Sequence, residues 1–222
     1  LARLQDDNKP FFLAASYTHP HDPFYITQEW WDMYEHPSID MPKPGSCNIE
    51  DMHPYDQWLQ THHMVDQHPP TEAHILNSRH AYYGMVSYFD SKVGELVHEL
   101  KRLGLAENTL VIVTSDHGEM LGEHGMWFKR TCYDASVRVP LIISGTDFVK
   151  GARTITNTVS LVDLFPTLME WSGLEDATAI AETLDGHSMK GIIADDGEAW
   201  DHPAICEYYS EGVCQPVRMA VK

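Results

Sequence analysis

Residues 114–129 combine an acid, an imidazole, closely spaced glycines and a single lysine. Asp116 offers a hard carboxylate oxygen and His117 a neutral imidazole nitrogen, and divalent metal ions bind both kinds of donor. Lys129 follows twelve residues after His117, and a fixed ammonium group can stabilise negative charge on an oxyanion. The segment therefore predicts a metal site beside an oxyanion site. The alternative interpretation is a helix cap followed by a solvated turn.

This cluster directly follows a run of apolar and β-branched residues at 110–114, which is typical of a strand buried on both faces. In an open α/β sheet, ligands bind beyond the carboxyl ends of the strands. A second apolar run, at 10–16, ends in the polar segment 17–24 and is expected to be another buried strand. Both strands would then deliver polar side chains to loops.

The residues between these two runs predict a long helix. Apolar side chains recur every three or four positions over 73–103, and Gly104 follows as a stop signal. The order strand, loop, helix, strand favours a βαβ unit and hence a parallel sheet in an α/β fold. Residues 25–71 lack clear periodicity, and a stretch of this length is expected to cover a site or carry function. Further elements are expected at 139–144 (strand), 160–171 (helix starting near Pro166), 204–209 and 216–221 (strands).

Composition argues against several classes of partner. The 15 Lys and Arg residues against 33 Asp and Glu residues give a net charge of −18, which repels phosphate groups. We therefore expect neither a nucleic acid nor an anionic membrane surface as partner. No apolar run reaches the roughly 18 residues of a membrane span, and residues 1–15 lack a signal-peptide core. The four cysteines show neither the density of a disulfide scaffold nor zinc-site spacing, which favours a reducing, cytoplasmic location.

Three motifs occur in a fixed order along the chain. They are Ser-Tyr-Thr-His-Pro-His-Asp-Pro-Phe at 16–24, Thr-Ser-Asp-His-Gly at 114–118 with Lys129, and Val-Ser-Leu-Val-Asp-Leu-Phe-Pro-Thr at 159–167. Together they resemble the sulfatase family of the alkaline phosphatase superfamily. Within that family, the His-Pro-His-Asp-Pro-Phe and Asp-His-Gly forms, with Cys-Glu-Tyr-Tyr-Ser-Glu-Gly at 206–212, look most like choline-sulfatases.

The resemblance implies an alkaline-phosphatase-like, mostly parallel sheet flanked by helices. Residues 1–222 would form a partial sulfatase domain, with the central sheet and helices at about 1–175 and the first C-terminal strands at about 200–222. Sulfatases carry an aspartate pair near the N-terminus and a Cys-x-Pro-x-Arg motif whose cysteine becomes formylglycine, the nucleophile. Neither precedes His21 here. Because the sequence also starts at Leu1 and stops within an expected strand, we expect an internal piece of a longer enzyme, inactive alone.

The resemblance also implies roles for four residues. Asp116 and His117 match the metal ligands, and the expected ion is calcium, with manganese left open by the imidazole. Lys129 matches a lysine that binds a sulfate oxygen, and His21 matches a histidine that contacts the sulfate or protonates the departing alcohol. The formylglycine would come from a cysteine outside this segment.

The expected substrate is a small sulfate ester, choline sulfate. A quaternary ammonium is held by aromatic faces and a carboxylate, for which Glu207, Trp127 and Tyr208 are candidates, with ordinary core packing as the alternative for each aromatic ring. His19 has a weaker claim on substrate binding. His124 is expected either to support His117 from behind or to be an ordinary loop histidine. No role is expected for five other histidines, which are His53, His62, His63, His68 and His74.

A second match to Cys-x-Pro-x-Arg lies at residues 214–218. It would make Cys214 the formylglycine precursor. The family, however, places this motif well before the metal and lysine motifs, whereas 214–218 follows both, within a segment that otherwise predicts a strand. We interpret the match as a coincidence.

The predicted function is sulfuric ester hydrolysis by a longer, homo-oligomeric parent enzyme acting on choline sulfate. One alternative is a phosphonate monoester or phosphodiester hydrolase of the same superfamily, which relative rates on sulfate and phosphate esters would separate. Another is a sulfatase-like binding protein without catalysis. An upstream aspartate pair and Cys-x-Pro-x-Arg motif, or a serine in place of that cysteine, would favour an enzyme.

Overall fold

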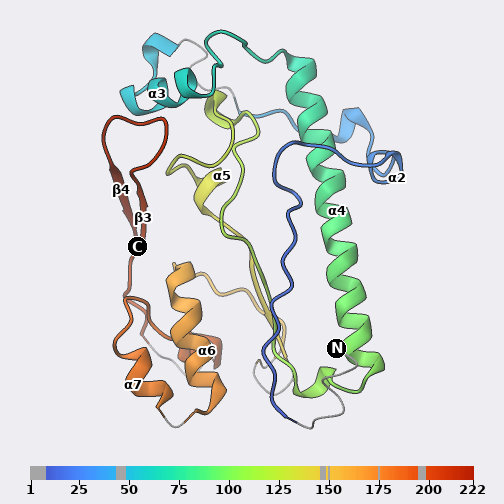
Figure 1. The fold of residues 1–222 in the computed structure, drawn as a ribbon, viewed down its shortest axis with the longest axis vertical. Coiled ribbons are helices and arrows are strands. Elements are labelled where there is room, and N and C mark those ends of the chain that lie inside the picture. The colour runs from blue at the N-terminus through green and yellow to red at the C-terminus, as the bar shows by residue number, and fades with distance from the viewer. Residues whose placement is uncertain (1–8, 44–48, 146–148, 150, 175, 195–198) are drawn as a thin grey trace. The chain divides into compact units, whose positions relative to one another are not determined.

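The computed structural model describes residues 9–43, 49–145, 149, 151–174, 176–194 and 199–222 (Figure 1). The chain forms two compact units. Unit 1 contains residues 1–107, 117–139 and 209–215, and unit 2 contains residues 108–116, 140–208 and 216–222. Each unit is described by itself.

Unit 1 is built on one long helix, α4 (Glu72–Arg102), shown in green in Figure 1. Thr71 caps its start: the Thr71 hydroxyl accepts a hydrogen bond from the His74 amide, and the His74 ring accepts one from the Thr71 amide. The helix ends at Leu103, and Gly104 follows with a left-handed φ of 68°. The helix predicted over 73–103 is therefore confirmed.

Short helices fill the stretch without periodicity. They are α2 (Gln28–Trp31), η1 (His36–Ser38), η2 (Ile49–Asp51) and α3 (Pro54–His62), and α2 packs against α4. A Cβ added at Gly84 would lie 2.9 Å from the Trp30 carbonyl oxygen, so the two helices approach closely at this glycine. Unit 1 also contains η4 (Glu123–Gly125) and α5 (Asp134–Val137). The stretch therefore contributes helices to the unit that contains His21 and Lys129.

The strand predicted at 10–16 is wrong. Residues 9–18 form neither helix nor strand, and Phe12 is 81% exposed and Leu13 52% exposed. An apolar run becomes a strand only when a neighbouring strand satisfies its backbone groups, and no strand pairs with this run among the described residues.

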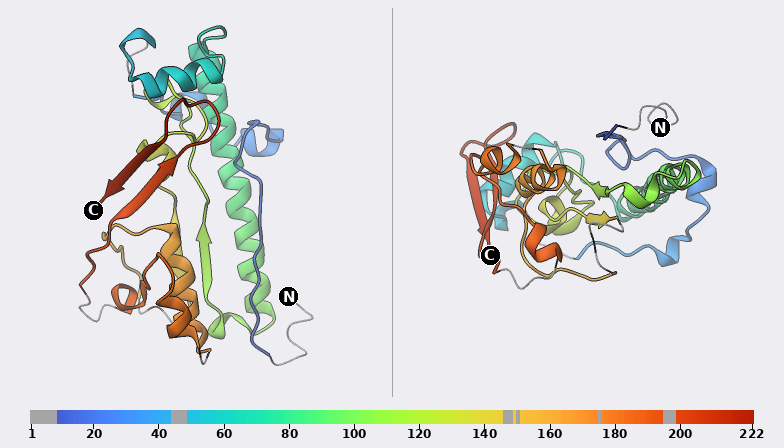
Figure 2. Two further views of the ribbon diagram at one scale, coloured as in Figure 1. Left: turned by 60° about the vertical axis from the view of Figure 1, so that its left-hand side comes forward. Right: turned by 90° about the horizontal axis from the view of Figure 1, so that it is seen from below.

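Among the described residues, unit 2 contains two antiparallel strand pairs, with helical segments between them in sequence. Strand β1 (Val111–Thr114) pairs with β2 (Leu141–Ser144), and β3 (Ala204–Tyr208) pairs with β4 (Val217–Val221), the red ribbon in Figure 2. The four strands are those predicted near 109–115, 139–144, 204–209 and 216–221. Their pairing differs from the expected parallel arrangement, because the βαβ argument relied on 10–16 as the partner strand of β1.

The motif at 159–167 forms the start of a helix. The 3₁₀ turn η5 (Leu161–Asp163) leads into α6 (Leu164–Ser172), and the Asp163 carboxylate accepts hydrogen bonds from the Ser160 and His187 amides at 2.7 and 2.8 Å. Pro166 lies in the first turn, as predicted, where its missing N–H costs little. The Asp163 carboxylate of this motif therefore joins the backbone at Ser160 to the backbone at His187 within unit 2.

The remaining helices complete the element order. They are η3 (Ala106–Asn108), α7 (Ala177–Ala181) and α8 (Lys190–Ala194). Among the described residues, no helix is both long enough and apolar enough to cross a membrane.

Candidate functional site

His21 and Lys129 meet in unit 1, although 108 residues separate them in sequence. The Lys129 Nζ lies 2.5 Å from His21 Nε2, and His21 Nδ1 lies 2.7 Å from the Asp22 carbonyl oxygen. A carbonyl oxygen only accepts, so Nδ1 carries the ring hydrogen and Nε2 accepts the hydrogen bond from the ammonium. The imidazole is thus held in a defined tautomer with Nε2 facing Lys129.

His117 lies beside this pair. Its ring centroid is 5.7 Å from that of His21, and the two rings are nearly perpendicular. Its Nδ1 is 2.7 Å from the Gly118 carbonyl oxygen, so the hydrogen is on Nδ1 and the lone pair of the neutral ring is on Nε2. Backbone carbonyls commonly orient metal-binding histidines in this way.

Asp116 belongs to unit 2, where it follows β1 by two residues and its side chain is exposed. The Ser115 hydroxyl lies 3.4 Å from Asp116 Oδ1. Asp116 and His117 are neighbours in the chain and supply one oxygen and one nitrogen donor, which suit a divalent ion. In the part of the chain that the structure describes, no group of three or more His, Cys, Asp or Glu side chains could hold a metal. The metal-binding role of Asp116 and His117 stays a prediction.

Gly118 allows the chain after His117 to lie directly on α5. Its N–H donates to the Ser136 carbonyl oxygen at 2.7 Å, and the next amide, of Glu119, donates to the Ala135 carbonyl oxygen at 2.9 Å. A Cβ added at Gly118 would lie 2.1 Å from that Ala135 oxygen. Only glycine fits this approach of two backbones.

A single carboxylate closes the loop between His117 and Lys129. Oε1 of Glu119 accepts hydrogen bonds from the Phe128 amide at 2.7 Å and from the Leu121 amide at 3.3 Å. Leu121 and Phe128 both have left-handed backbones, with φ of 45° and 66°. Burial raises the pKa of Glu119, and the two amides and the Lys129 charge oppose that rise.

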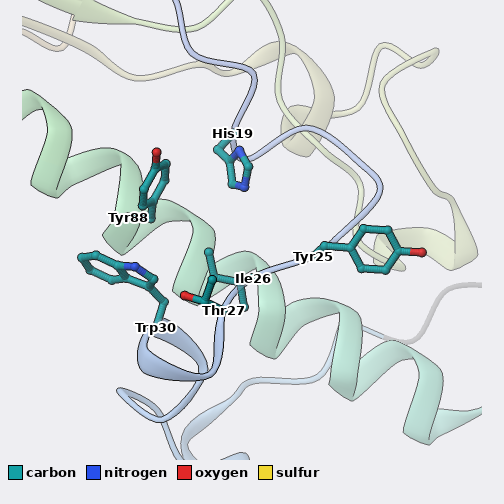
Figure 3. Close-up of a pocket in the computed structure, with 6 residues that line it drawn as sticks. All are labelled: His19, Tyr25, Ile26, Thr27, Trp30 and Tyr88. Carbon is teal, nitrogen blue, oxygen red and sulfur yellow. The ribbon is translucent and has the colours of Figure 1, made fainter.

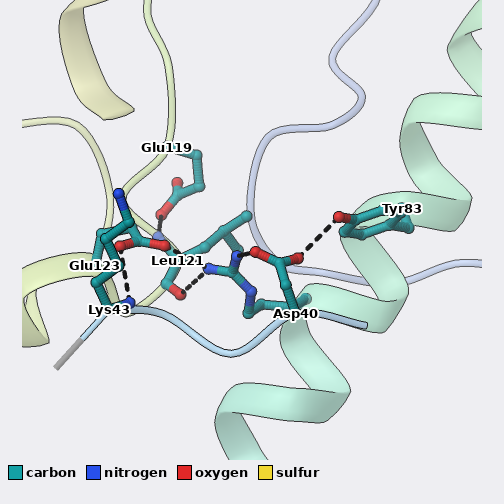
Figure 4. Close-up of polar contacts among 7 residues, drawn as sticks. Asp40, Lys43, Tyr83, Glu119, Leu121 and Glu123 are labelled. Atoms are coloured by element: carbon teal, nitrogen blue, oxygen red, sulfur yellow. Dashed lines mark hydrogen bonds and ion pairs between the residues drawn. The ribbon is translucent and has the colours of Figure 1, made fainter. Parts of the chain in front are cut away.

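Figure 4 shows polar contacts of Asp40, Tyr83, Leu121 and Glu123 near this loop. Arg79 of α4 contacts the same loop. This buried guanidinium donates to the Leu121 carbonyl oxygen at 3.1 Å, to Glu123 at 3.2 Å and to Asp40 at 2.5 Å. Tyr83 donates to the other Asp40 oxygen at 2.8 Å. Partial burial opposes ionisation of Asp40, but the Tyr83 hydrogen bond and the Arg79 charge outweigh it and lower its pKa. Arg79 therefore ties the loop to the long helix.

His63, for which the sequence predicted no role, lies in this region. Arg130, the neighbour of Lys129, donates to His63 Nε2 at 3.2 Å and forms an ion pair with Glu211 at 2.7 Å. The His63 ring also packs edge-on against Phe128, with centroids 4.8 Å apart. Burial lowers the pKa of His63 to about 4, helped by the positive charges of Arg130 and His62. No local pattern marks these contacts, because they join segments far apart in sequence.

His19 lies apart from the contacts of His21. It lines a pocket of about 470 Å³ with Tyr25, Ile26, Thr27, Trp30 and Tyr88. Figure 3 shows the His19, Tyr88 and Trp30 side chains gathered at this pocket, and the His19 and Tyr88 ring centroids are 5.2 Å apart. Its role in binding substrate stays a prediction.

The other expected substrate-binding residues are spread over both units. Glu207 lies opposite Arg218 in the β3–β4 register and forms an ion pair with it. Tyr208 is the next residue on the strand, so its side chain points to the other face of the ribbon. Trp127 is half-buried in unit 1, next to Phe128.

The structure bears on two interpretations that the sequence left open, one for Cys214 and one for His124. Cys214 is exposed in the connection between β3 and β4, and Arg218 of the same motif lies within β4, the strand predicted at 216–221. The ring of the exposed His124 stacks on Tyr133 with centroids 4.4 Å apart. This contact favours the loop-histidine interpretation over support of His117.

Comparisons with known proteins place the chain in a family. The family model described as Sulfatase matches residues 1–174. The choline-sulfatase of Rhizobium meliloti is 35% identical over 219 residues, which are 98% of this chain and 42% of that enzyme. A sulfatase of Formosa agariphila is 34% identical over 172 residues, 75% of this chain and 33% of that protein. Among solved structures, a phosphonate monoester hydrolase from Silicibacter pomeroyi matches with a TM-score of 0.73 and 28% identity, over 85% of this chain and 38% of that one.

These likenesses define the class of the protein. The fold is alkaline-phosphatase-like and incomplete, as predicted. The chain belongs to the sulfatase family. It spans less than half the length of the relatives that it matches.

Proposed function

We propose that the protein is a sulfuric ester hydrolase and that this chain supplies the groups that bind and protonate the sulfate ester. The observation that carries the proposal is the meeting of Lys129 and His21 at 2.5 Å, beside His117. Their shared position suits an anion that accepts hydrogen bonds from both.

The sulfate ester would replace the hydrogen bond between the two side chains. A sulfuryl oxygen would accept from the Lys129 ammonium, which stabilises the charge that grows on the transferring group. The proposed general acid is His21 in its imidazolium form. Its Nε2 hydrogen could then pass to the departing alcohol oxygen, and such acid catalysis typically contributes about 10²- to 10⁴-fold in rate.

Asp116 and His117 would hold the metal ion, for which calcium is expected and manganese is the alternative. The lone pair on His117 Nε2 and the exposed Asp116 carboxylate suit that role. A divalent ion there would supply neutralising charge to the ester oxygens. Residues 214–218 do not suit the formylglycine nucleophile, because Cys214 lies in a hairpin turn and Arg218 is paired with Glu207. We expect that nucleophile outside these 222 residues.

Choline sulfate is the proposed substrate. The 35% identity to a choline-sulfatase over 98% of the chain supports it, as does an exposed carboxylate, Glu207, in a segment rich in tyrosine. Arg218 currently neutralises this carboxylate, so a choline cation would have to displace an exposed ion pair, which costs little. A cytoplasmic location and a homo-oligomeric state remain predictions from the sequence.

Phosphonate monoester hydrolysis is the second candidate, favoured by the structural match at 28% identity. The test compares the full-length protein on choline sulfate, 4-nitrophenyl sulfate and a phenyl phosphonate monoester. We expect kcat/KM to be highest for choline sulfate, and to fall on chelation and recover with added calcium or manganese. A higher kcat/KM for the phosphonate would favour the second candidate, and no turnover of any ester would contradict both.

A further inference from the structure

Glu119 is a half-buried carboxylate that the proposed chemistry does not use. One of its oxygens receives two backbone amides, those of Leu121 and Phe128. Both donors belong to non-glycine residues with positive φ, a conformation that side chains with a Cβ adopt only when the surroundings impose it. The carboxylate gives these two inward-turned amides a partner.

The hydrogen bond from the Phe128 amide to Glu119 connects two distant positions of the loop. Phe128 immediately precedes Lys129, and His117 lies two residues before Glu119. The hydrogen bond from Phe128 to Glu119 therefore joins the two ends of the loop, and the Met120 amide reinforces it by donating to the Phe128 carbonyl oxygen at 2.8 Å. This closure acts beside the Ser136 contacts, in which the Ser136 carbonyl oxygen accepts from the Gly118 amide and the Ser136 hydroxyl donates to the Lys129 carbonyl oxygen.

We propose that Glu119 is a positioning residue that holds Lys129 in register with His21 and His117 by accepting the Phe128 and Leu121 amides. The inference rests on the proposed function, because it assigns the closure of the loop to placement of the sulfate-binding ammonium. A positioning role requires an acceptor oxygen at the right reach, and it does not require the negative charge of the side chain.

Two substitutions of Glu119 separate the effect of its side-chain length from the effect of its negative charge. Glu119→Gln keeps the side-chain length and a carbonyl oxygen that can accept both amides, but removes the charge. Glu119→Asp keeps the charge but withdraws the oxygen by one methylene. Glu123→Asp is the matched control, because it shortens another carboxylate of the same loop whose contacts go to Arg79 and the Lys43 amide.

The experiment uses the full-length protein with three measurements: hydrogen exchange at the Leu121 and Phe128 amides, steady-state kinetics on choline sulfate, and the thermal midpoint. We expect Glu119→Asp to lose protection at both amides and about 100-fold in kcat, as small misplacements of catalytic groups do. Glu119→Gln should keep the protection and stay within about fivefold of the wild-type kcat, in line with the same rule. Glu123→Asp should leave the exchange of both amides unchanged.

Two results would overturn the inference. One is wild-type amide protection in Glu119→Asp, and the other is a kcat that falls equally in the Gln and Asp variants at matched thermal midpoints, which would assign the effect to charge. If the wild-type protein hydrolyses no ester, the proposed function fails while the exchange data still test the closure. If Glu119→Asp does not fold, Glu119→Gln decides: retained protection supports the inference and lost protection contradicts it.

Discussion

The loop 118–130 of unit 1 and the β3–β4 hairpin of unit 2 hold their candidate residues in different ways. The loop is tied down by a glycine contact on α5, by the Glu119 carboxylate and by Arg79 of α4. In the hairpin, the side chain of Glu207 is held by an ion pair to Arg218, and the Arg218 side chain is 73% exposed. Backbone hydrogen bonds in a half-buried loop resist displacement far more than an exposed pair does.

The loop carries residues proposed to bind the sulfuryl group, and the hairpin carries residues proposed to bind the alcohol portion of the ester. Residues that would contact the sulfuryl group lie on backbone fixed by several independent contacts, as preorganised electrostatic stabilisation requires. Residues that would contact the alcohol portion can rearrange at little cost. The proposed sulfuryl-binding residues are therefore held more rigidly than the proposed alcohol-binding residues.

The largest expected effect comes from removing the ammonium group of the fixed loop. Lys129→Ala should lower kcat by about 10²- to 10³-fold, because charge on the transferring group loses a preorganised donor. Steady-state kinetics on a sulfate ester measure it. Lys101→Ala, an exposed lysine in the last turn of α4, is the control and should change kcat little. Near-wild-type turnover in Lys129→Ala would contradict the proposed role of this lysine in stabilising the transferring group.

The next effect tests whether the loop is as tightly fixed as its contacts indicate. In Gly118→Ala, the new methyl would meet the Ala135 carbonyl oxygen at 2.1 Å, and backbone cannot move aside as a flexible side chain can. We expect a loss of about 1–3 kcal/mol in the free energy of unfolding, together with a lower kcat. Chemical denaturation measures the first quantity.

Gly94→Ala is the matched control for that substitution. Gly94 lies within α4, and nothing lies within 4 Å of an added Cβ. Alanine there should stabilise the protein by about 0.5–1 kcal/mol through helix propensity. Equal stabilities of the two variants would show that the loop can yield at Gly118.

The same region separates what sequence could predict from what it could not. Helix α4 follows from a local period and a cap, and Asp116, His117 and Lys129 stand out because they share one short segment. The meeting of His21 with Lys129 was accessible only through the family resemblance. Local pattern does not mark Glu119, because its partners are backbone amides of the loop and not side chains of a recognisable motif. It does not mark Arg79 or His63 either, because their partners lie far away in sequence.

The failed strand at 10–16 has the same cause as these missed contacts. Its apolar composition is a local property, whereas a strand is defined by the neighbour that completes its hydrogen bonds. The antiparallel β1–β2 pair shows the same limit: the positions of both strands were predictable, but their relative direction depends on tertiary pairing.

A smaller effect concerns His63 behind Arg130. Its pKa is about 4 in the folded protein against an ordinary value of 6.5, so the unfolded chain takes up the proton first as pH falls. The stabilising contribution of neutral His63 is therefore present above pH 6.5 and is lost between 6.5 and about 4. The slope is at most about 1.4 kcal/mol per pH unit for one proton. His63→Gln should flatten the stability curve in this window, and parallel curves for variant and wild type would contradict it.

The smallest expected effect is a change in KM when the Glu207–Arg218 ion pair of the β3–β4 hairpin is altered. If Glu207 binds the choline cation, then Arg218 competes with the substrate for the same carboxylate. Glu207→Gln should raise KM for choline sulfate by no more than about fivefold, the range of an exposed ion pair, and leave 4-nitrophenyl sulfate unchanged. Arg218→Gln should have the opposite effect and lower KM for choline sulfate, because the carboxylate no longer has an internal partner. Equal changes in KM for choline sulfate and for 4-nitrophenyl sulfate would contradict a role of Glu207 in binding the choline cation.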